Sequence, residues 1–466
     1  MKKHVTRALA LLLAVLMVFT ICGCKKGEDK NKTKYDPLPG ETPVDLDGYE
    51  FTVIDVNNGR WNKELSGTPH TDAWLQIMDE VEYLYNCTLT ATQSTAQEIF
   101  NVVQPEIMAG GKAANIIVTT QWSMGQFVGA NLLADLNTLD VNWDNEWWNQ
   151  NIRNISTLGG KTYVGNGSFI FDTAQTWILY YNEAIWDECG FPDPYELVDN
   201  GQWTFDRFRE YCRIAAKDLD GTGVLDSSQD RWGLTAPDGD FADALYFALG
   251  GHYFAPNENG KVDLVCNTDR TFTIVEAMCN FVKQDKTMDT TKYDPWQERF
   301  NTFTAGNALF LGYVPGVAVL TDMEDDWGAL PLPKFDASQE DYYSSVDHNS
   351  SVFAVTNTND ELYETAVVLE ALGRHAMILE DIYWPDYKDI YWRHPEDDAR
   401  MLDEYVVGHG QYDMALLMAR CNDAFSAPRT QVYRLMFQSA GSDYSSYIDM
   451  VEDAIESTIT DYFESR

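Results

Sequence analysis

Apolar and polar residues alternate in some stretches of the chain and recur at helical spacing in others. Residues 49–56 (YEFTVIDV) alternate in this way and are rich in β-branched and aromatic residues, which predicts a strand. Residues 71–86 place Trp74, Ile77 and Val81 on one helical face, which predicts a helix. The two patterns then alternate, with strands expected at 87–92 and 114–120 and helices at 96–111 and 124–136. This alternation predicts an α/β domain with a parallel core.

A second series of strands and helices begins near residue 176. Strands are expected at 176–182, 231–236, 306–313, 327–335 and 350–358, and a hairpin at 253–267. Helices are expected at 183–190, 201–219, 241–249 and 271–285, and over most of the chain after residue 361. Gly190 is placed to end the first of these helices and Thr204 to cap the second. No short internal repeat occurs, which excludes a solenoid.

The start of the chain has the pattern of an export signal. Three basic residues precede an apolar run over residues 8–21, which is too short to be interpreted first as a membrane span. The run ends in Ile-Cys-Gly-Cys, which resembles the bacterial lipobox, and the resemblance implies removal of residues 1–23 and a diacylglycerol on Cys24. The mature protein would then be anchored to the membrane by its lipid, through a polar tether over residues 24–46. An uncleaved helical anchor is the alternative.

The composition of the chain argues against a nucleic-acid partner and against a zinc site. The chain has 466 residues, 33 Lys and Arg against 73 Asp and Glu, and a formal net charge of −40. Such a surface repels phosphate backbones and anionic lipids, so we expect no nucleic-acid partner. The length suggests two or three lobes. No Cys-x-x-Cys or Cys/His zinc spacing occurs, so buried free thiols are expected, although one disulfide is possible.

An acidic stretch at residues 217–234 (KDLDGTGVLDSSQDRWGL) follows the spacing of a calcium loop. Oxygen-bearing side chains stand at positions 1, 3, 5 and 9 of that pattern, and Gly223 stands where the chain must turn. Position 12 is Gln229 where a Glu is usual, but Asp230 follows it. The expected calcium ligands are Asp218, Asp220, Thr222, the Val224 carbonyl, Asp226 and Asp230. The alternative is an Asp- and Gly-rich turn without metal. A strand is expected after the loop, so any calcium here would be structural.

The order of elements resembles the extracellular solute-binding proteins of carbohydrate ABC transporters. The resemblance rests on the strand and helix at 114–136, on WILYYNEAIWDECGFPDP followed by GQWTFDRFREYCRIA, and on the segments TAGNALFLGY and WGALPLPKF. It implies an α/β fold of the type II periplasmic-binding-protein kind, with two lobes joined by hinge strands and a ligand cleft between them. We assign residues 47–175 and 314–358 to lobe 1, and 176–313 and 359–466 to lobe 2.

A sugar site needs flat aromatic rings for the C–H faces of the sugar and charged or amide groups for its hydroxyls. In the family, loops after the strands of each lobe touch ligand. The expected ligand-binding residues are therefore Trp61, Trp122, Asp172, Gln175, Asp240, Phe241, Tyr313, His348 and Trp384. Alternatives stay open for several of them, because Trp61, Trp122 and Trp384 could equally pack in the core and His348 could lie in an exposed loop.

The resemblance implies a monomeric, lipid-anchored protein on the outer face of the cytoplasmic membrane. It would capture a mono- or oligosaccharide there and deliver it to the permease subunits of an ABC transporter, without catalysis. Binding would shift a hinge equilibrium from an open to a closed form. One alternative is a surface glycan-binding or sensor-feeding module without transport. A glycoside hydrolase is a further alternative, for which the many acidic residues give no specific carboxylate pair.

Overall fold

A computed structural model describes residues 34–57, 59–64, 66–170, 175–226, 229–257, 261–290, 296–315, 318–382, 392–439 and 441–464. The chain divides into two compact units, Met1–Thr42 and Pro43–Arg466, and all helices and strands below belong to the second. The predicted signal peptide and Cys24 lie outside the described residues. No helix in the described part of the chain has the length and apolar composition that crossing a bilayer requires.

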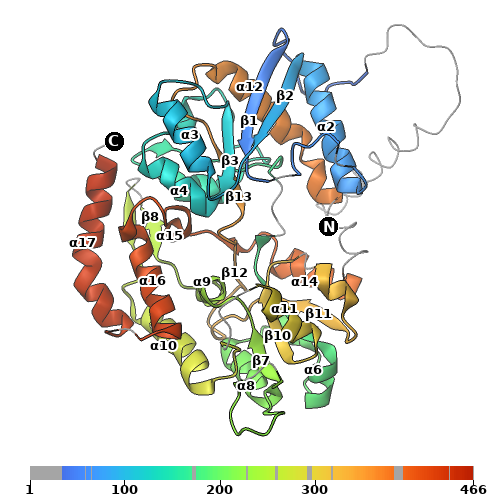
Figure 1. The fold of residues 1–466 in the computed structure, drawn as a ribbon, viewed down its shortest axis with the longest axis vertical. Coiled ribbons are helices and arrows are strands. Elements are labelled where there is room, and N and C mark those ends of the chain that lie inside the picture. The colour runs from blue at the N-terminus through green and yellow to red at the C-terminus, as the bar shows by residue number, and fades with distance from the viewer. Residues whose placement is uncertain are drawn as a thin grey trace, which may run out of the picture. The chain divides into compact units, whose positions relative to one another are not determined.

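The first sheet has the strand order β13-β3-β1-β2 (Figure 1). Strand β1 (Tyr49–Asp55) pairs in parallel with β2 (Cys87–Gln93) and β3 (Ile116–Thr120), while β13 (Ser351–Ala354) runs antiparallel to β3. Helices α2 (Pro69–Tyr85) and α12 (Leu362–His375) pack in the hydrophobic cluster on one face. Helices α3 (Ile99–Met108) and α4 (Gln121–Gly129) cover the other face. The parallel core predicted for this region is confirmed.

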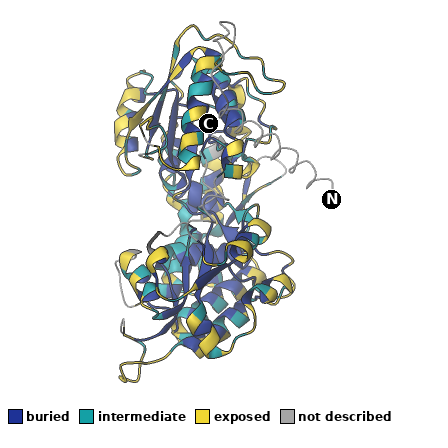
Figure 2. Ribbon diagram, turned by 90° about the vertical axis from the view of Figure 1, so that its right-hand side faces the viewer, coloured by how far each residue is buried: buried dark blue, intermediate teal, exposed yellow. Residues whose placement is uncertain are grey.

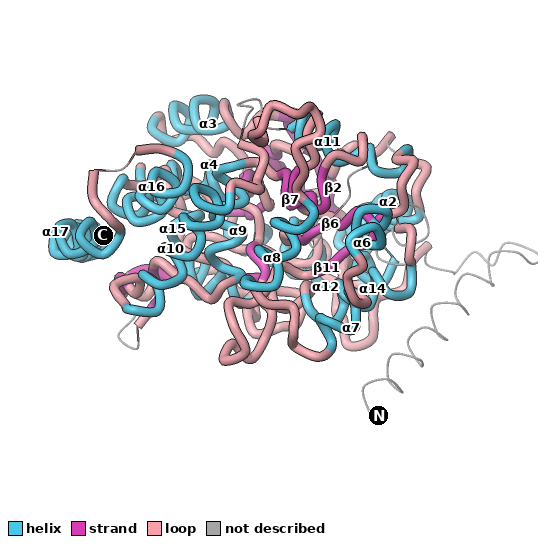
Figure 3. The backbone as a smooth tube through the Cα atoms, turned by 90° about the horizontal axis from the view of Figure 1, so that it is seen from below, coloured by secondary structure: helices cyan, strands magenta, loops and turns pink. Residues whose placement is uncertain are grey.

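The second sheet has the strand order β11-β6-β10-β7. Strand β6 (Ile178–Asn182) is antiparallel to both β10 (Ala308–Tyr313) and β11 (Trp327–Leu330), and β10 is parallel to β7 (Trp232–Thr235). Helices α6 (Glu183–Cys189), α7 (Pro194–Asp199) and α8 (Phe205–Ala215) pack on one face, and α11 (Trp296–Thr304) and α14 (Pro395–Tyr405) on the other. Helix α6 lies beside β6 and β11 (Figure 3). The strands of both sheets are mostly buried (Figure 2), except the edge strand β2, which is largely exposed.

The remaining elements pack around these sheets. The helices are α5 (Gln150–Ser156), α9 (Asp238–Ala248), α10 (Asp269–Asn280), α15 (Met414–Leu417), α16 (Asp423–Phe437) and α17 (Tyr444–Glu464). A π-helix covers Phe281–Asp285, and 3₁₀ turns cover Leu136–Thr138 and Ala318–Asp322. Short antiparallel pairs join β4 (Thr157–Leu158) to β5 (Lys161–Thr162), and β8 (Phe254–Pro256) to β9 (Val262–Leu264).

Three crossover segments, residues 175–177, 344–350 and 409–411, run beside one another where the chain passes between the two sheets. Strands β12 (Ser344–Ser345) and β14 (Gly410–Gln411) pair in parallel. The Trp177 N–H donates to the Ser345 carbonyl (2.9 Å), and Thr176 forms a bridge with Val346. These contacts correspond to the hinge strands that the sequence led us to expect.

The structure corrects four sequence predictions. Residues 327–330, assigned to lobe 1, form β11 of the second sheet, and residues 362–375, assigned to lobe 2, form α12 on the first sheet. Both lobe assignments depend on contacts between residues far apart in the sequence, which local patterns do not encode. The helix expected at 124–136 ends at Gly129, because the chain turns at Asn131, whose φ is positive. Thr204 occupies the N-cap position of α8, but its side chain makes no capping hydrogen bond.

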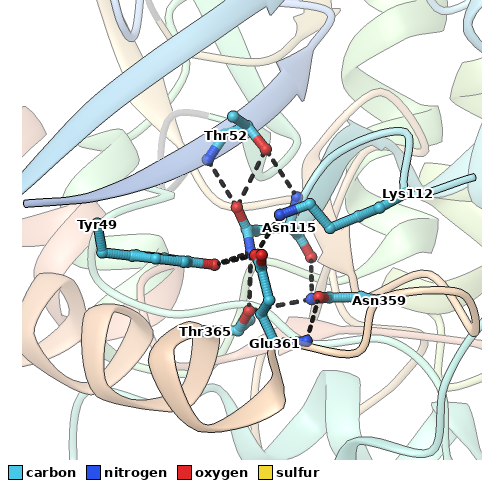
Figure 4. A network of polar contacts seen from close by, with 7 residues as sticks. All are labelled: Tyr49, Thr52, Lys112, Asn115, Asn359, Glu361 and Thr365. Atoms are coloured by element: carbon cyan, nitrogen blue, oxygen red, sulfur yellow. Dashed lines mark hydrogen bonds and ion pairs between the residues drawn. The ribbon is translucent and has the colours of Figure 1, made fainter. Parts of the chain in front are cut away.

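A polar network fixes the edge of the first sheet at which its parallel strands begin (Figure 4). Buried Asn115 lies at its centre and accepts from the Thr52 N–H (2.8 Å) and Oγ1 (3.0 Å). Its Nδ2 donates to the Tyr49 hydroxyl and to Thr365 Oγ1 on α12 (3.1 Å). Glu361 completes the network by accepting from Tyr49 and pairing with Lys112. The network therefore holds α12 against strands that lie 250 residues earlier in the chain.

A buried carboxyl ties α14 to the second sheet. Asp398 is fully buried and accepts from the Ala329 N–H (2.8 Å), the Tyr195 hydroxyl (2.9 Å) and the His394 N–H (3.2 Å). Burial raises the pKa of Asp398 to about 7, although these hydrogen bonds act in the opposite direction.

Candidate ligand-binding site

Four of the predicted ligand residues gather near the ends of β3 and β10 and the start of α9. In α/β sheets, ligands bind outside the carboxyl ends of the parallel strands, where loops can offer side chains. Trp122 is the second residue of α4, which follows β3 directly and whose N-cap Thr120 accepts from the Ser123 N–H (3.3 Å). The cap fixes the first turn of α4 and with it the place where Trp122 leaves the backbone.

Trp122 contacts the crossover residue His348. Its backbone N–H donates to the His348 carbonyl (3.1 Å), and the two rings meet edge to face with centroids 5.6 Å apart. The imidazole Nδ1 lies 3.7 Å from a carboxylate oxygen of Asp240 and 3.9 Å from one of Asp347. His348 is thus placed between an indole of the first lobe and a carboxylate of the second.

Asp240 lies in the first turn of α9. Burial raises the pKa of this carboxyl to about 6, while His348 beside it lowers the value and neighbouring Asp347 and Asp243 raise it. A carboxyl that is partly protonated near neutral pH both donates and accepts hydrogen bonds, which suits a ligand that carries hydroxyl groups.

Two arginines from the C-terminal helical region complete the site, and the sequence analysis missed both. The guanidinium of Arg429 lies 5.4 Å from the centroid of the Trp122 ring, and that of Arg420 lies 5.9 Å from it. Arg429, on α16, also pairs through Nε (2.7 Å) with buried Asp243 on α9. Helix α16 has an ordinary amphipathic pattern in the sequence. The one feature that could have indicated a site there is Arg429, a charged residue between the buried and the exposed face of the helix.

Asp347 anchors the floor of the site. It accepts from the Trp177 Nε1–H (2.8 Å), and its own N–H donates to the Gln175 carbonyl (2.7 Å). The Tyr313 ring packs against Trp177 at 5.8 Å, and burial raises the pKa of its hydroxyl, with Asp347 and Asp240 adding to the effect. Gln175 and Tyr313 therefore lie next to this floor. We name the set Trp122, Asp240, Tyr313, Asp347, His348, Arg420 and Arg429 the Trp122 site.

The other predicted residues are placed differently. Phe241 is fully buried and packs against Trp177, so the prediction of a ligand contact is corrected to a core position. Helix α9 is buried at every residue from Phe241 to Ala248, so Phe241 belongs to a segment that is enclosed on all sides. Asp172 and Trp384 lie outside the described residues.

Trp61 lines a separate cavity of about 210 Å³ at the ends of β1 and β2. Its Nε1–H donates to buried Asp55 (2.7 Å), which also pairs with Arg60 (3.2 Å). Arg60 reaches on to Ser351 Oγ (2.9 Å) at the start of β13. Trp61 also packs edge to face on Trp74, which is the core contact considered from sequence, and its contact with a sugar stays a prediction.

The acidic loop holds three of its predicted calcium ligands together. Carboxylate oxygens of Asp218, Asp220 and Asp230 lie within 4.8 Å of one another. Asp218 also accepts from the Gly221 N–H (2.7 Å) and from the Gly223 N–H (2.6 Å). Both glycines have positive φ, which only glycine adopts without strain.

The other predicted ligands lie in the same turn. The Thr222 hydroxyl donates to the Val224 carbonyl (3.1 Å), and the Asp226 N–H donates to Asp230 (3.1 Å). Strand β7 follows the loop, as predicted. The donor set consists of hard oxygens and therefore fits calcium.

Comparisons with known proteins agree with this architecture. A profile of the bacterial extracellular solute-binding protein family matches residues 67–370. A comparison with curated proteins finds no match to the chain.

Solved structures share the fold at low identity. The cyclic alpha-maltosyl-1,6-maltose binding protein from Arthrobacter globiformis aligns at 12% identity and TM-score 0.59, over 89% of this chain and 100% of its own. An ABC substrate-binding protein from Listeria monocytogenes in complex with cycloalternan aligns at 15% identity and TM-score 0.55, with the same coverage. A receptor from Streptomyces glaucescens, solved unliganded and with acarbose, aligns at 14% and 0.55, over 89% of this chain and 99% of its own.

Proposed function

The chain belongs to the family of bacterial extracellular solute-binding proteins, and on that premise we propose that it binds a carbohydrate at the Trp122 site. The observation that carries the proposal is the close placement of the Trp122 indole, two guanidinium groups, His348 and the Asp240 carboxyl, whose pKa is raised by burial. Aromatic faces accept the C–H surface of a sugar ring, and charged groups fix the directions of its hydroxyls.

Further support comes from the ligands of similar structures, which include cycloalternan and acarbose. The proposed role is capture of the sugar outside the cell and delivery to the permease of an ABC transporter by a monomer anchored through Cys24. A surface module that feeds a sensor would use the same site.

The mechanism follows from the elements that contribute to the site. Trp122 belongs to the first lobe, Asp240 to the second, and His348 to a crossover segment between them. A sugar that contacts both Trp122 and Asp240 favours whichever relative position of the lobes allows both contacts, so binding shifts the hinge equilibrium.

Replacement of Trp122 by alanine is expected to weaken saccharide binding by about 2 kcal/mol, or about 30-fold in Kd, because the ring supplies the largest apolar surface of the site. Titration calorimetry with a saccharide selected by thermal-shift screening measures the effect. Tyr363→Ala, at an exposed position of α12, is the matched control and should bind as the wild type does. Equal affinity in Trp122→Ala would place the sugar elsewhere. Release of a cleaved product from an oligosaccharide would favour a hydrolase instead.

We further propose that the acidic loop at residues 218–230 binds one structural calcium ion. Bound calcium would cross-link the end of α8 to the start of β7, because Asp218 and Asp230 stand at the two ends of the loop. The bound ion would neutralise carboxylates that otherwise repel one another.

Calcium added to chelator-treated protein, at about 100-fold above Kd, is expected to stabilise the fold by about 2.7 kcal/mol. Asp218→Ala should abolish both the binding heat and the shift in Tm, whereas Asp360→Ala, at an exposed position outside the loop, should keep them. Absence of binding heat in the wild-type protein would leave the loop as a hydrogen-bonded turn.

A further inference from the structure

A second cavity, of about 330 Å³, lies beside the crossover segments. Its walls come from residues 146–149, 151, 152, 166–168, 170, 376, 377, 380, 407, 408, 410 and 412, together with the crossover residues 176, 346 and 350. No residue of the Trp122 site lines it. Its volume falls within the range of about 300–1,000 Å³ that small-molecule sites occupy. We name it the crossover cavity.

The lining of the crossover cavity combines polar and apolar residues and carries no charge in its interior. Among the described residues that line it there is no Lys, Arg or His. Its two carboxylates, Glu146 and Glu380, belong to exposed residues at the rim. The other lining residues include amide, hydroxyl and aromatic side chains, among them Asn149, Asn166, Ser168, Thr176, Trp147 and Tyr412. An anionic ligand would meet repulsion at the rim and find no cation within.

Two of these amides are held in fixed orientations. The Asn149 Nδ2 donates to the Tyr412 hydroxyl (3.0 Å), and the Asn166 Nδ2 donates to the Ser351 carbonyl (2.9 Å). The Oδ1 of Asn166 has no hydrogen-bond partner in the part of the chain that the structure describes, and so it remains an acceptor for a donor from a ligand.

We propose that the crossover cavity is a second ligand site, which takes a neutral polyhydroxylated molecule of about monosaccharide size. Hydroxyl groups would hydrogen-bond to the oriented amides, and the Trp147 and Tyr412 rings would cover the apolar face of the molecule. This proposal does not depend on which ligand the Trp122 site takes.

The two sites share one crossover segment. Ser350 lines the crossover cavity and accepts from Gln121, its Oγ from Nε2 (2.5 Å) and its carbonyl from the N–H (2.9 Å), and Gln121 directly precedes Trp122. Val346 also lines the cavity, two residues before His348. The crossover cavity and the Trp122 site therefore both contact the segment 346–350.

Titration calorimetry with a panel of neutral mono- and disaccharides tests the proposal. The wild type should show two binding events, and Met377→Trp, which adds bulk at the cavity rim, should lose one of them. Ile378→Trp is the matched control, because Ile378 is next in the chain and 42% exposed but does not line the cavity. Both positions are at least 36% exposed, so both variants should fold.

The possible outcomes distinguish the proposal for the crossover cavity from the proposed function of the Trp122 site. A single event that Trp122→Ala removes and Met377→Trp leaves intact would overturn the second site and keep the proposed function. An event that survives Trp122→Ala and is lost in Met377→Trp supports the second site, even if the proposed function fails. Absence of binding to every saccharide of the panel would overturn the ligand class proposed for the cavity.

Discussion

Replacement of Asn115 by leucine is expected to lower the free energy of unfolding by about 4 kcal/mol. The two side chains are similar in size, so the loss comes from hydrogen bonds and not from a cavity. The amide serves Thr52, Tyr49 and Thr365 at once, and leucine leaves buried Thr365 and the partly buried Thr52 and Tyr49 without it (Figure 4). Each buried polar group left unsatisfied costs about 1–3 kcal/mol.

Urea unfolding monitored by circular dichroism measures this loss. Asn301→Leu is the matched control, because Asn301 is exposed on α11 and accepts one hydrogen bond, from Gln297 within the same helix. Its effect should stay within about 0.5 kcal/mol. A loss below about 1 kcal/mol in Asn115→Leu would show that the network adds little to the attachment of α12.

Lowering the pH from about 8 to about 5 is expected to stabilise the folded chain by about 3 kcal/mol through Asp398 alone. Burial raises the pKa of this carboxyl to about 7, whereas in the unfolded chain it returns to about 3.9. The folded state therefore takes up the proton first as the pH falls. The free energy of unfolding rises as the pH falls from about 7 to about 3.9. This gain is lost again as the pH rises through the same window to about 7.

Asp398→Asn isolates this contribution. The Asn carbonyl oxygen can still accept from the Ala329 N–H and the Tyr195 hydroxyl, so the variant keeps two of the three contacts without a titrating group. Asp240, whose pKa is raised to about 6, remains in the variant and contributes a smaller rise in the same direction. The free energy of unfolding of the wild type minus that of the variant should rise by about 3 kcal/mol from pH 8 to pH 5. A constant difference would mean that Asp398 stays ionised over that range.

Local patterns predicted the strands and helices well and predicted their partners poorly. Strand β1 and helix α2 follow from the spacing of their own apolar residues, as do the positions of β3 and β10. The position of β11 in the second sheet depends on its pairing with β6, more than 140 residues earlier. No periodicity encodes such a pairing, and the same holds for α12, which is attached to the first sheet through Asn115.

The candidate site shows a similar division. Trp122, Asp240 and His348 were predicted because each follows or precedes an element at the ligand-binding edge, and the structure brings them together. The prediction that Phe241 contacts ligand was wrong because α9 is buried on almost all sides. Phe241, next to Asp240 in the sequence, therefore lies in the core. Arg420 and Arg429 were missed because they come from a region more than 70 residues beyond His348, where the sequence shows only helical patterning.

The position of β13 also governs the order in which this protein can fold. Strand β3 is fully buried, yet one of its edges pairs only with β13, some 230 residues later in synthesis. Until residue 354 is available, that edge exposes unpaired backbone groups, and exposed edges invite aggregation. The first lobe is therefore completed only after every strand of the second sheet has been made, and pairing over such separations is slow. A chain held unfolded until it is nearly complete, as during transport through a membrane channel, would avoid this exposed intermediate.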